Sequence, residues 1–175
     1  MSAVRIDTAV ANFRAGLGAI VCAMVCAILL GTPGPLLASG GVFERAAKPL
    51  AGAPAFDEHA GSVGLLVLFQ PECPWCVRQF DAAGKLANDR PDIAVIAVGL
   101  RGRRMELIRE LRRARARLPA YLASPELLET LGKPEGTPRL YVVDRHGRIV
   151  AWAAGYHDPA QLTYLIAAAG ESGDH

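Results

Sequence analysis

The stretch "FQPECPWCVRQF", residues 69–80, is the most informative part of the chain, because it places two cysteines where a predicted strand meets a predicted helix. The run "GLLVLF" (64–69) is continuously apolar and is typical of a buried strand. The segment "PWCVRQFDAAGKLAND" (74–89) predicts a helix whose first turn contains Pro74, a residue that suits this position. We therefore expect Cys73 at or just before the start of a helix.

This position favours a redox role for Cys73 and Cys76. The free backbone N–H groups and the positive dipole at a helix start stabilise a thiolate, which makes Cys73 a nucleophile. Cys76, one turn later, can attack a mixed disulfide on Cys73 and release the substrate. A disulfide between residues this close constrains little chain, so a structural role is less favoured.

A metal site is the competing interpretation of this pair. Structural zinc takes four ligands, and no second pair or histidine partner has a fitting spacing; the histidines are His59, His146, His157 and His175. Cys22 and Cys26 lie in the apolar run "AGLGAIVCAMVCAILL" and are interpreted as small hydrophobic side chains. Two thiolates alone can hold copper(I), so a copper-binding module stays an alternative.

Strand and helix patterns continue to alternate after the cysteines. We expect a strand at 92–100, a helix at 103–118, a short strand at 118–123, a helix at 124–132, a hairpin of strands 138–144 and 148–154, and a helix at 158–170. In the helix at 103–118, we expect an inward apolar face formed by Met105, Ile108, Leu111 and Leu118. This order predicts a mixed sheet with helices on both faces.

Two separated motifs, "LVLFQPECPWC" (66–76) and "EGTPRLYVVDRHGRIVAWAAG" (135–155), resemble thioredoxin-fold proteins of the TlpA/ResA type. The segment "LPAYLASPELLETLGKPEGTP" (118–138) resembles the strand-helix insertion of that branch. The resemblance covers about residues 63 to 169. It implies a thioredoxin-like, three-layer α/β/α fold in a membrane-tethered, extracytoplasmic thiol-disulfide oxidoreductase.

The resemblance also implies the roles of the site residues. Cys73 attacks, Cys76 resolves, and Pro74 and Trp75 complete the motif, with Trp75 offering apolar surface to partner proteins. Pro138 is expected to follow a cis peptide bond opposite the cysteines, with the backbone of Thr137 pairing with a substrate peptide. No cofactor and no metal are expected.

The sequence departs from the family near the second cysteine. The family commonly has a Glu three residues after it, where this chain has Gln79, and the strand at 64–69 contains no acid. An acid near the buried thiol would help to move its proton, and this chain has none in either of these places. Glu72, beside Cys73, is interpreted as a solvated loop carboxylate.

The N-terminal part predicts export. Arg5 and Arg14 precede a stretch without charge from Ala15 to Phe43. We divide the chain into a cytoplasmic N-terminus (1–14), a transmembrane anchor or signal segment (15–38), a linker (39–62), the thioredoxin-like domain (63–170) and a tail (171–175). Since the cleavage pattern near Ala38 is incomplete, an uncleaved anchor is favoured. The arginines place the domain in the periplasm, tethered to the inner membrane.

The segment "RGRRMELIRELRRARAR" (101–117) holds eight arginines and two glutamates. We interpret it as a solvated helix face, with binding of acidic lipid as an alternative. Export and the lack of aromatic residues between the arginines argue against nucleic acid.

The sequence therefore predicts a periplasmic protein thiol-disulfide oxidoreductase, acting as a reductant. Its expected partners are exported thiol or disulfide proteins and a membrane electron donor or acceptor for the dithiol. The alternatives are a disulfide oxidase or isomerase, and a copper(I)-binding or assembly-factor module that uses the same two cysteines.

Overall fold

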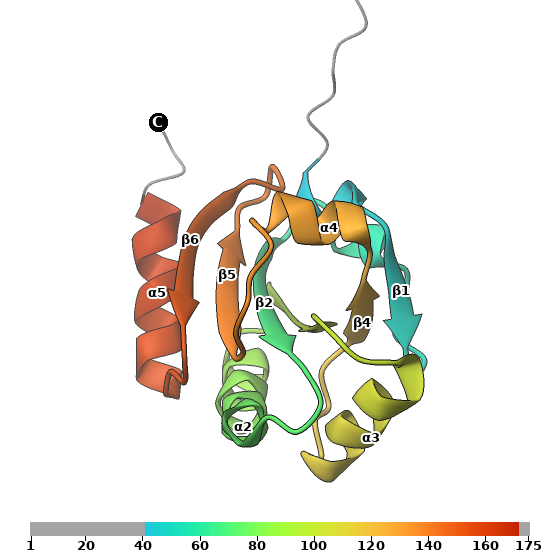
Figure 1. The fold of residues 1–175 in the computed structure, drawn as a ribbon. Coiled ribbons are helices and arrows are strands. Elements are labelled where there is room, and N and C mark those ends of the chain that lie inside the picture. The colour runs from blue at the N-terminus through green and yellow to red at the C-terminus, as the bar shows by residue number, and fades with distance from the viewer. Residues whose placement is uncertain (1–40, 172–175) are drawn as a thin grey trace, which may run out of the picture. The chain divides into compact units, whose positions relative to one another are not determined.

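β2 (Val63–Phe69) is the centre of the sheet. It pairs in parallel with β3 (Ile93–Gly99) along its whole length and antiparallel with β5 (Arg139–Val143) on its other side. The computed structural model describes residues 41–171 of the chain. The six strands follow the order β1-β4-β3-β2-β5-β6, with β1 (Ala47–Leu50) and β6 (Ile149–Ala154) at the edges and β4 (Ala120–Ala123) parallel to β3. Figure 1 shows this order from the β6 edge to the β1 edge.

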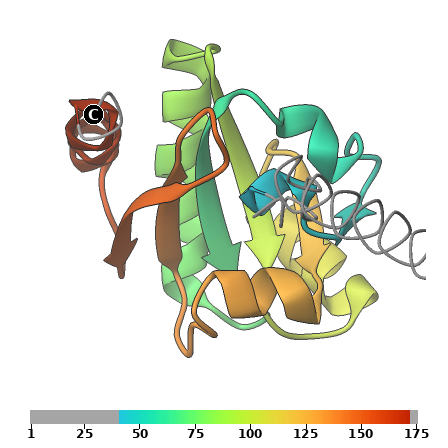
Figure 2. The ribbon, with the colours of Figure 1, turned by 90° about the horizontal axis from the view of Figure 1, so that it is seen from above.

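Two apolar clusters, one on each face, hold helices against the sheet. α2 (Pro74–Asp89), α3 (Arg104–Arg113) and α5 (Pro159–Glu171) contribute to the cluster that contains Leu65, Val67 and Phe69. α4 (Pro125–Thr130) and two short 3-10 turns, η1 (Val42–Glu44) and η2 (Phe56–His59), cover Leu66 and Leu68 on the other face. Successive side chains of a strand point to opposite faces, which is why β2 is apolar throughout. Figure 2 shows α5 beside the β6 edge, away from α4. The mixed-sheet α/β architecture that the sequence predicts is confirmed.

The segment predicted as a linker, 39–62, is part of the domain from Val42 onward. η1 and η2 bury Val42, Phe43 and Phe56, and β1 pairs antiparallel with β4. β1 is four residues long, has one buried side chain and contains Pro49. A short edge strand tolerates proline and needs little apolar pattern, so its composition resembles that of a linker.

The predicted inward face of α3 is confirmed at Leu111 and wrong at Met105, and the helix ends at Arg113, before Leu118. Met105 is 66% exposed, whereas Leu107 and Leu111 are buried. Buried Glu110 completes the inward face. The prediction chose the apolar residue Met105 and passed over the carboxylate, although the spacing 107, 110, 111 is the helical one.

The predicted anchor or signal segment, 15–38, lies outside the described residues. Among residues 41–171, no helix combines the length and the apolar character needed to cross a membrane.

Candidate active site

Cys73 is the N-cap residue of α2, and Cys76 lies one turn inside the helix. The two form a disulfide with a Cα–Cα distance of 5.3 Å. The Cys73 Sγ accepts a hydrogen bond from the backbone N–H of Cys76 at 3.2 Å, and Pro74 occupies the first helical turn, where its missing N–H costs nothing. Cys76 is fully buried and Cys73 is 6% exposed. Cys73 is therefore the cysteine nearer to solvent.

A second segment faces the dithiol from the start of β5. The Thr137–Pro138 peptide bond is cis, the form that the family resemblance implies for this proline. The Thr137 hydroxyl donates a hydrogen bond to Cys73 Sγ at 3.4 Å. Antiparallel pairing of β5 with β2, which ends four residues before Cys73, brings these segments together. The arrangement supplies Cys73 Sγ with two donors that can stabilise a thiolate.

Trp75 lies between the cysteines and is 53% exposed. The Arg78 guanidinium carbon lies 4.8 Å from the centre of its ring, within cation–π range. The ring of Tyr156 lies 6.2 Å from it, tilted by 35°. The sequence singled out Trp75 but missed Tyr156, which lies in the connection from β6 to α5, where no periodic pattern places a side chain.

Gln79 occupies the position where the family that the sequence resembles commonly has Glu, and it is fully buried. Its amide makes two hydrogen bonds to the backbone of His157: His157 N–H donates to Oε1 at 2.8 Å, and Nε2 donates to His157 O at 3.1 Å. Gln79 has no titratable group, so it cannot carry a proton for Cys76.

A buried acid does lie near the motif, on a different element. The Glu110 side chain of α3 accepts a hydrogen bond from the backbone N–H of Glu72 at 3.4 Å and pairs with Arg113 at 2.6 Å. Glu72 itself is exposed, as expected for a solvated carboxylate, and it has a left-handed φ of 60°. Glu110 therefore holds the loop that leads into Cys73. Only the helical spacing with Leu107 and Leu111 could have revealed it.

The described histidines do not join the dithiol in a metal site. Among residues 41–171, no three side chains of the types His, Cys, Asp and Glu come together as a metal-binding group. His59 instead contacts the Tyr121 hydroxyl at 2.7 Å, and Phe43 and Phe56 pack around the pair. Burial lowers the pKa of His59 below 6.5, against a smaller opposite effect of Glu58, and burial raises the pKa of Tyr121 to about 12. His175, Cys22 and Cys26 lie outside the described residues.

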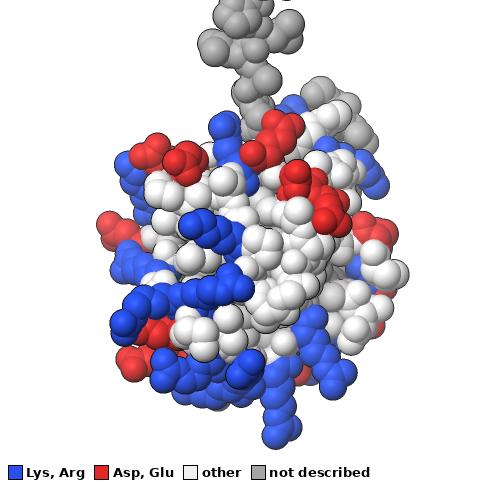
Figure 3. All heavy atoms as spheres, turned by 90° about the vertical axis from the view of Figure 1, so that its right-hand side faces the viewer, with Lys and Arg blue, Asp and Glu red and all other residues white. Residues whose placement is uncertain are grey.

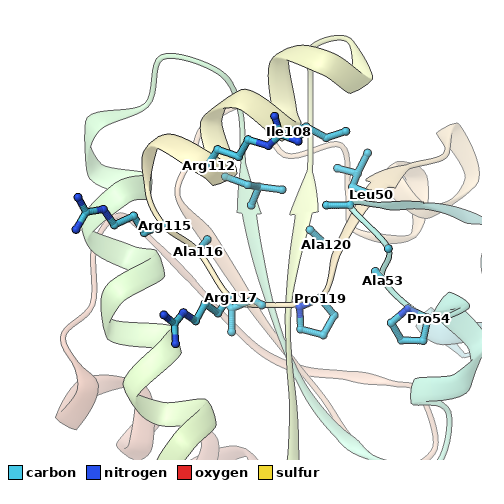
Figure 4. Close-up of a pocket in the computed structure, with 14 residues that line it drawn as sticks. Leu50, Ala53, Pro54, Ile108, Arg112, Arg115, Ala116, Arg117, Pro119 and Ala120 are labelled. Atoms are coloured by element: carbon cyan, nitrogen blue, oxygen red, sulfur yellow. The ribbon is translucent and has the colours of Figure 1, made fainter.

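The arginines of 101–117 form a basic surface on the α3 side of the molecule. Figure 3 shows Lys and Arg side chains gathered around an uncharged area on this face. A cavity of about 580 Å³ lies there, and its lining includes Leu50, Pro54, Ile108 and Leu118 together with three arginines. Figure 4 shows Arg115 and Arg117 pointing away from the Leu50 and Pro54 side of the cavity. The guanidinium groups therefore do not converge on one point, as a site for a single anion would require.

The fold and the site together define a thioredoxin-like protein with a CXXC pair at the start of α2. Among solved structures, the chain is similar to DsbF of Mycobacterium tuberculosis, with a TM-score of 0.63 and 18% identity over 73% of this chain and 96% of that one. It is similar to a putative thiol:disulfide interchange protein DsbE from Chlorobium tepidum, with a TM-score of 0.62 and 21% identity over 74% and 96%. It is also similar to a thiol-disulfide isomerase from Corynebacterium glutamicum, with a TM-score of 0.60 and 21% identity over 75% and 97%.

No protein-family model and no curated protein matches the sequence. At 18 to 21% identity, the likeness to these structures establishes the thioredoxin-like fold.

Proposed function

We propose that this chain is a protein thiol-disulfide oxidoreductase that works through Cys73 and Cys76. One observation carries the proposal: Cys73 caps α2 beside the cis-Pro138 segment, with Cys76 buried one turn behind it. This geometry gives one sulfur access to a partner and keeps the second within reach of the first. The solved structures to which the fold is similar include several described as thiol-disulfide oxidoreductases, interchange proteins or isomerases, which supports the same chemistry.

In the reducing direction, the Cys73 thiolate attacks one sulfur of a substrate disulfide. The substrate S–S bond breaks, its second sulfur leaves as a thiolate, and a mixed disulfide forms on Cys73. Cys76 then loses its proton and attacks Cys73 Sγ, which releases the other substrate sulfur. The substrate gains two electrons and, from the medium and Cys76, two protons, while Cys73 and Cys76 become the disulfide. The backbone at Thr137 is placed to pair with the substrate segment.

We infer that the protein acts as a reductant of exported proteins, as the resemblance to the TlpA/ResA type implies. Oxidation is the second candidate, and one observation favours it. The Cys76 N–H and the Thr137 hydroxyl both donate to Cys73 Sγ. Donors that stabilise the thiolate stabilise the reduced protein, and a more stable reduced form makes a dithiol a stronger oxidant.

Location in the periplasm, with the inner membrane as anchor, is part of the same proposal. It rests on Arg5 and Arg14 before the uncharged stretch that begins at Ala15. Two similar structures are described as a secreted oxidoreductase and an exposed lipoprotein. Fractionation of cells that express the full chain checks this location: recovery in the soluble cytoplasm would overturn it. In this location, a membrane electron donor or acceptor would return Cys73 and Cys76 to the redox state in which they react with a substrate.

Trapping of partners tests the function itself. In a Cys76→Ser variant the mixed disulfide on Cys73 cannot be resolved, so exported proteins should accumulate as covalent adducts. These adducts should be absent in a Cys73→Ser variant, and their absence in both would count against the proposal. Equilibration of the wild-type dithiol with glutathione decides the direction. A potential of about −270 mV supports a reductant, and a potential of about −120 mV supports an oxidant.

A further inference from the structure

The amide of Gln79 acts as a two-sided connector between α2 and the segment that follows β6. Oε1 accepts from His157 N–H and Nε2 donates to His157 O, so one side chain satisfies both polar groups of one backbone residue. A carboxylate in its place could accept from the N–H but could not donate to the carbonyl. A hydrocarbon could do neither. Because Gln79 is fully buried, solvent cannot replace these two bonds.

The segment that Gln79 holds, Gly155–His157, is here called the bridge segment. Its other end is bonded to the cis-proline region, because Gly155 N–H donates to Pro138 O at 2.9 Å. Within it, His157 Nδ1 lies 3.1 Å from Gly155 O. Gly155 has a φ of 83°, a left-handed conformation that suits glycine. The bridge segment is therefore fixed to both walls of the dithiol site, α2 and the start of β5.

Tyr156, the middle residue of the bridge segment, lies beside Trp75. The Tyr156 ring and the Arg78 guanidinium both lie next to the Trp75 ring. Trp75 and Tyr156 are 53% and 39% exposed, so this apolar surface is open to a partner next to Cys73. Among the described residues, no carboxylate forms an ion pair with Arg78, so its charge is available to an acidic group. Aromatic side chains held in place before binding lose little conformational freedom when a partner arrives.

We propose that Gln79 is a positioning residue that holds the bridge segment, so that Tyr156, Trp75 and Arg78 form a preformed recognition surface for the partner. The surface fits a protein segment that carries an aromatic or aliphatic side chain and a carboxylate close to its reactive cysteine. This inference rests on the proposed thiol-disulfide exchange and specifies the kind of substrate that the same site selects. It also gives Gln79 a role that an ionised carboxylate could not fill.

The test compares two disulfide-linked model peptides, one with Phe and Asp beside its cysteine and one with Gly and Asn there. The measured quantity is the ratio of their kcat/KM values, so any general change in dithiol reactivity cancels. For the wild-type chain we expect a preference of about tenfold for the Phe/Asp peptide, the size expected from one aromatic contact and one ion pair. In Gln79→Glu the ratio should fall close to one at pH 8. The ionised carboxylate cannot donate to the His157 carbonyl and repels it, so the bridge segment is no longer held and Tyr156 loses its position beside Trp75.

Acidification gives a signature that general destabilisation would not give. Once the carboxyl group introduced by Gln79→Glu is protonated, it can again donate to His157 O, so the ratio should recover as the pH falls, while the wild-type ratio stays constant. Gln161→Glu is the matched control: Gln161 Oε1 accepts from Asp158 N–H at 2.9 Å, and a carboxylate can make the same bond. This control adds the same charge and should keep the wild-type ratio.

Three results would overturn the inference: a wild-type ratio of one, an unchanged ratio in Gln79→Glu at pH 8, or a ratio in that variant that does not respond to pH. If Gln79→Glu does not fold, Tyr156→Ala removes an exposed ring and leaves the buried amide bonds in place; an unchanged ratio there would also overturn it. Failure of the proposed function looks different, since the wild-type chain would then exchange with neither peptide.

Discussion

The Thr137 hydroxyl lies 3.4 Å from Cys73 Sγ, although 64 residues separate the two in sequence. The contact joins the cis-proline segment to the sulfur of the N-cap cysteine, and it depends on the register between β2 and β5. Two groups donate to this sulfur, the Cys76 backbone N–H and the Thr137 hydroxyl. Because the hydroxyl belongs to a side chain, a substitution can remove it.

Thr137→Val removes that donor and keeps the shape of the side chain. The Cys73 thiolate loses stabilisation, so attack on a disulfide peptide should slow by about threefold to tenfold, and the dithiol potential should become more negative by about 10 to 30 mV. Stopped-flow kinetics and glutathione equilibration measure the two effects. Thr163→Val, on the exposed side of α5, removes a hydroxyl that donates to Pro159 O within the same helix, and it should change neither quantity. A less negative potential in Thr137→Val would contradict the assignment.

Gly64→Ala tests whether the segment from Val42 belongs to the domain. A Cβ at Gly64 would approach Phe43 Cζ to 2.5 Å, and Phe43 is 2% exposed. The ring must move, so the free energy of unfolding should fall by about 1–3 kcal/mol. Gly84→Ala is the matched substitution in α2, where nothing lies within 4 Å of the new carbon. It should raise the free energy of unfolding by about 0.5–1 kcal/mol, because alanine favours the helix. Denaturant titration checks both, and equal effects would contradict the packing of Phe43.

The pair of His59 and Tyr121 should make stability depend on pH in two separate windows. The pKa of His59 lies below 6.5 in the folded protein, so the unfolded chain binds the proton more readily. Stability is then complete above pH 6.5 and declines as the pH falls below it. The pKa of Tyr121 rises from 10.0 to about 12, so its contribution is present below pH 10 and is lost as the pH rises toward 12.

Unfolding titrations across these ranges measure the two slopes. His59→Gln should remove the slope just below pH 6.5 and leave the alkaline one. Tyr121→Phe should reduce the alkaline slope, and the part that remains belongs to Tyr141, whose pKa burial also raises. If His59→Gln keeps the full slope just below pH 6.5, another group is responsible.

Glu110 should matter for stability as well as for the loop before Cys73. Glu110→Ala removes a buried acceptor and the ion pair with Arg113, and it opens a small cavity, so unfolding should become easier by about 1–3 kcal/mol. Glu129→Ala breaks a pair with Lys133 in which both side chains are more than two-thirds exposed, and it should change stability by less than about 0.5 kcal/mol. Similar losses in the two variants would mean that Glu110 is not held as described.

The start of α2 could be predicted closely because several local preferences coincide there. An apolar strand, a proline suited to the first turn and an inward face with Phe80 and Leu86 all agree, and α2 has the predicted bounds 74–89. β1 could not be predicted in this way. Its place in the sheet depends on pairing with β4, whose paired residues lie at least 70 positions later, and its own residues are those of a loop.

The parts of the site that sequence did not reveal are the ones made by tertiary contacts. Tyr156 is positioned by the hydrogen bonds of its two neighbours, Gly155 and His157. Glu110 belongs to the site because it accepts a hydrogen bond from the loop residue Glu72. Gln79 was noticed as a missing acid, yet its partner is a backbone group 78 residues later. A polar side chain that bonds to a distant backbone leaves no periodic trace in the sequence.

The way the described chain begins has a mechanical consequence. Val42 N–H donates to Gly147 O at 2.8 Å, so the first described residues are fastened to the turn between β5 and β6. That turn lies at the far end of β5 from Pro138, and β5 is paired on both sides, with β2 and β6. The point where the described chain begins is therefore tied to the end of β5 that lies opposite the dithiol, and neighbouring strands hold β5 on both sides between that point and the site.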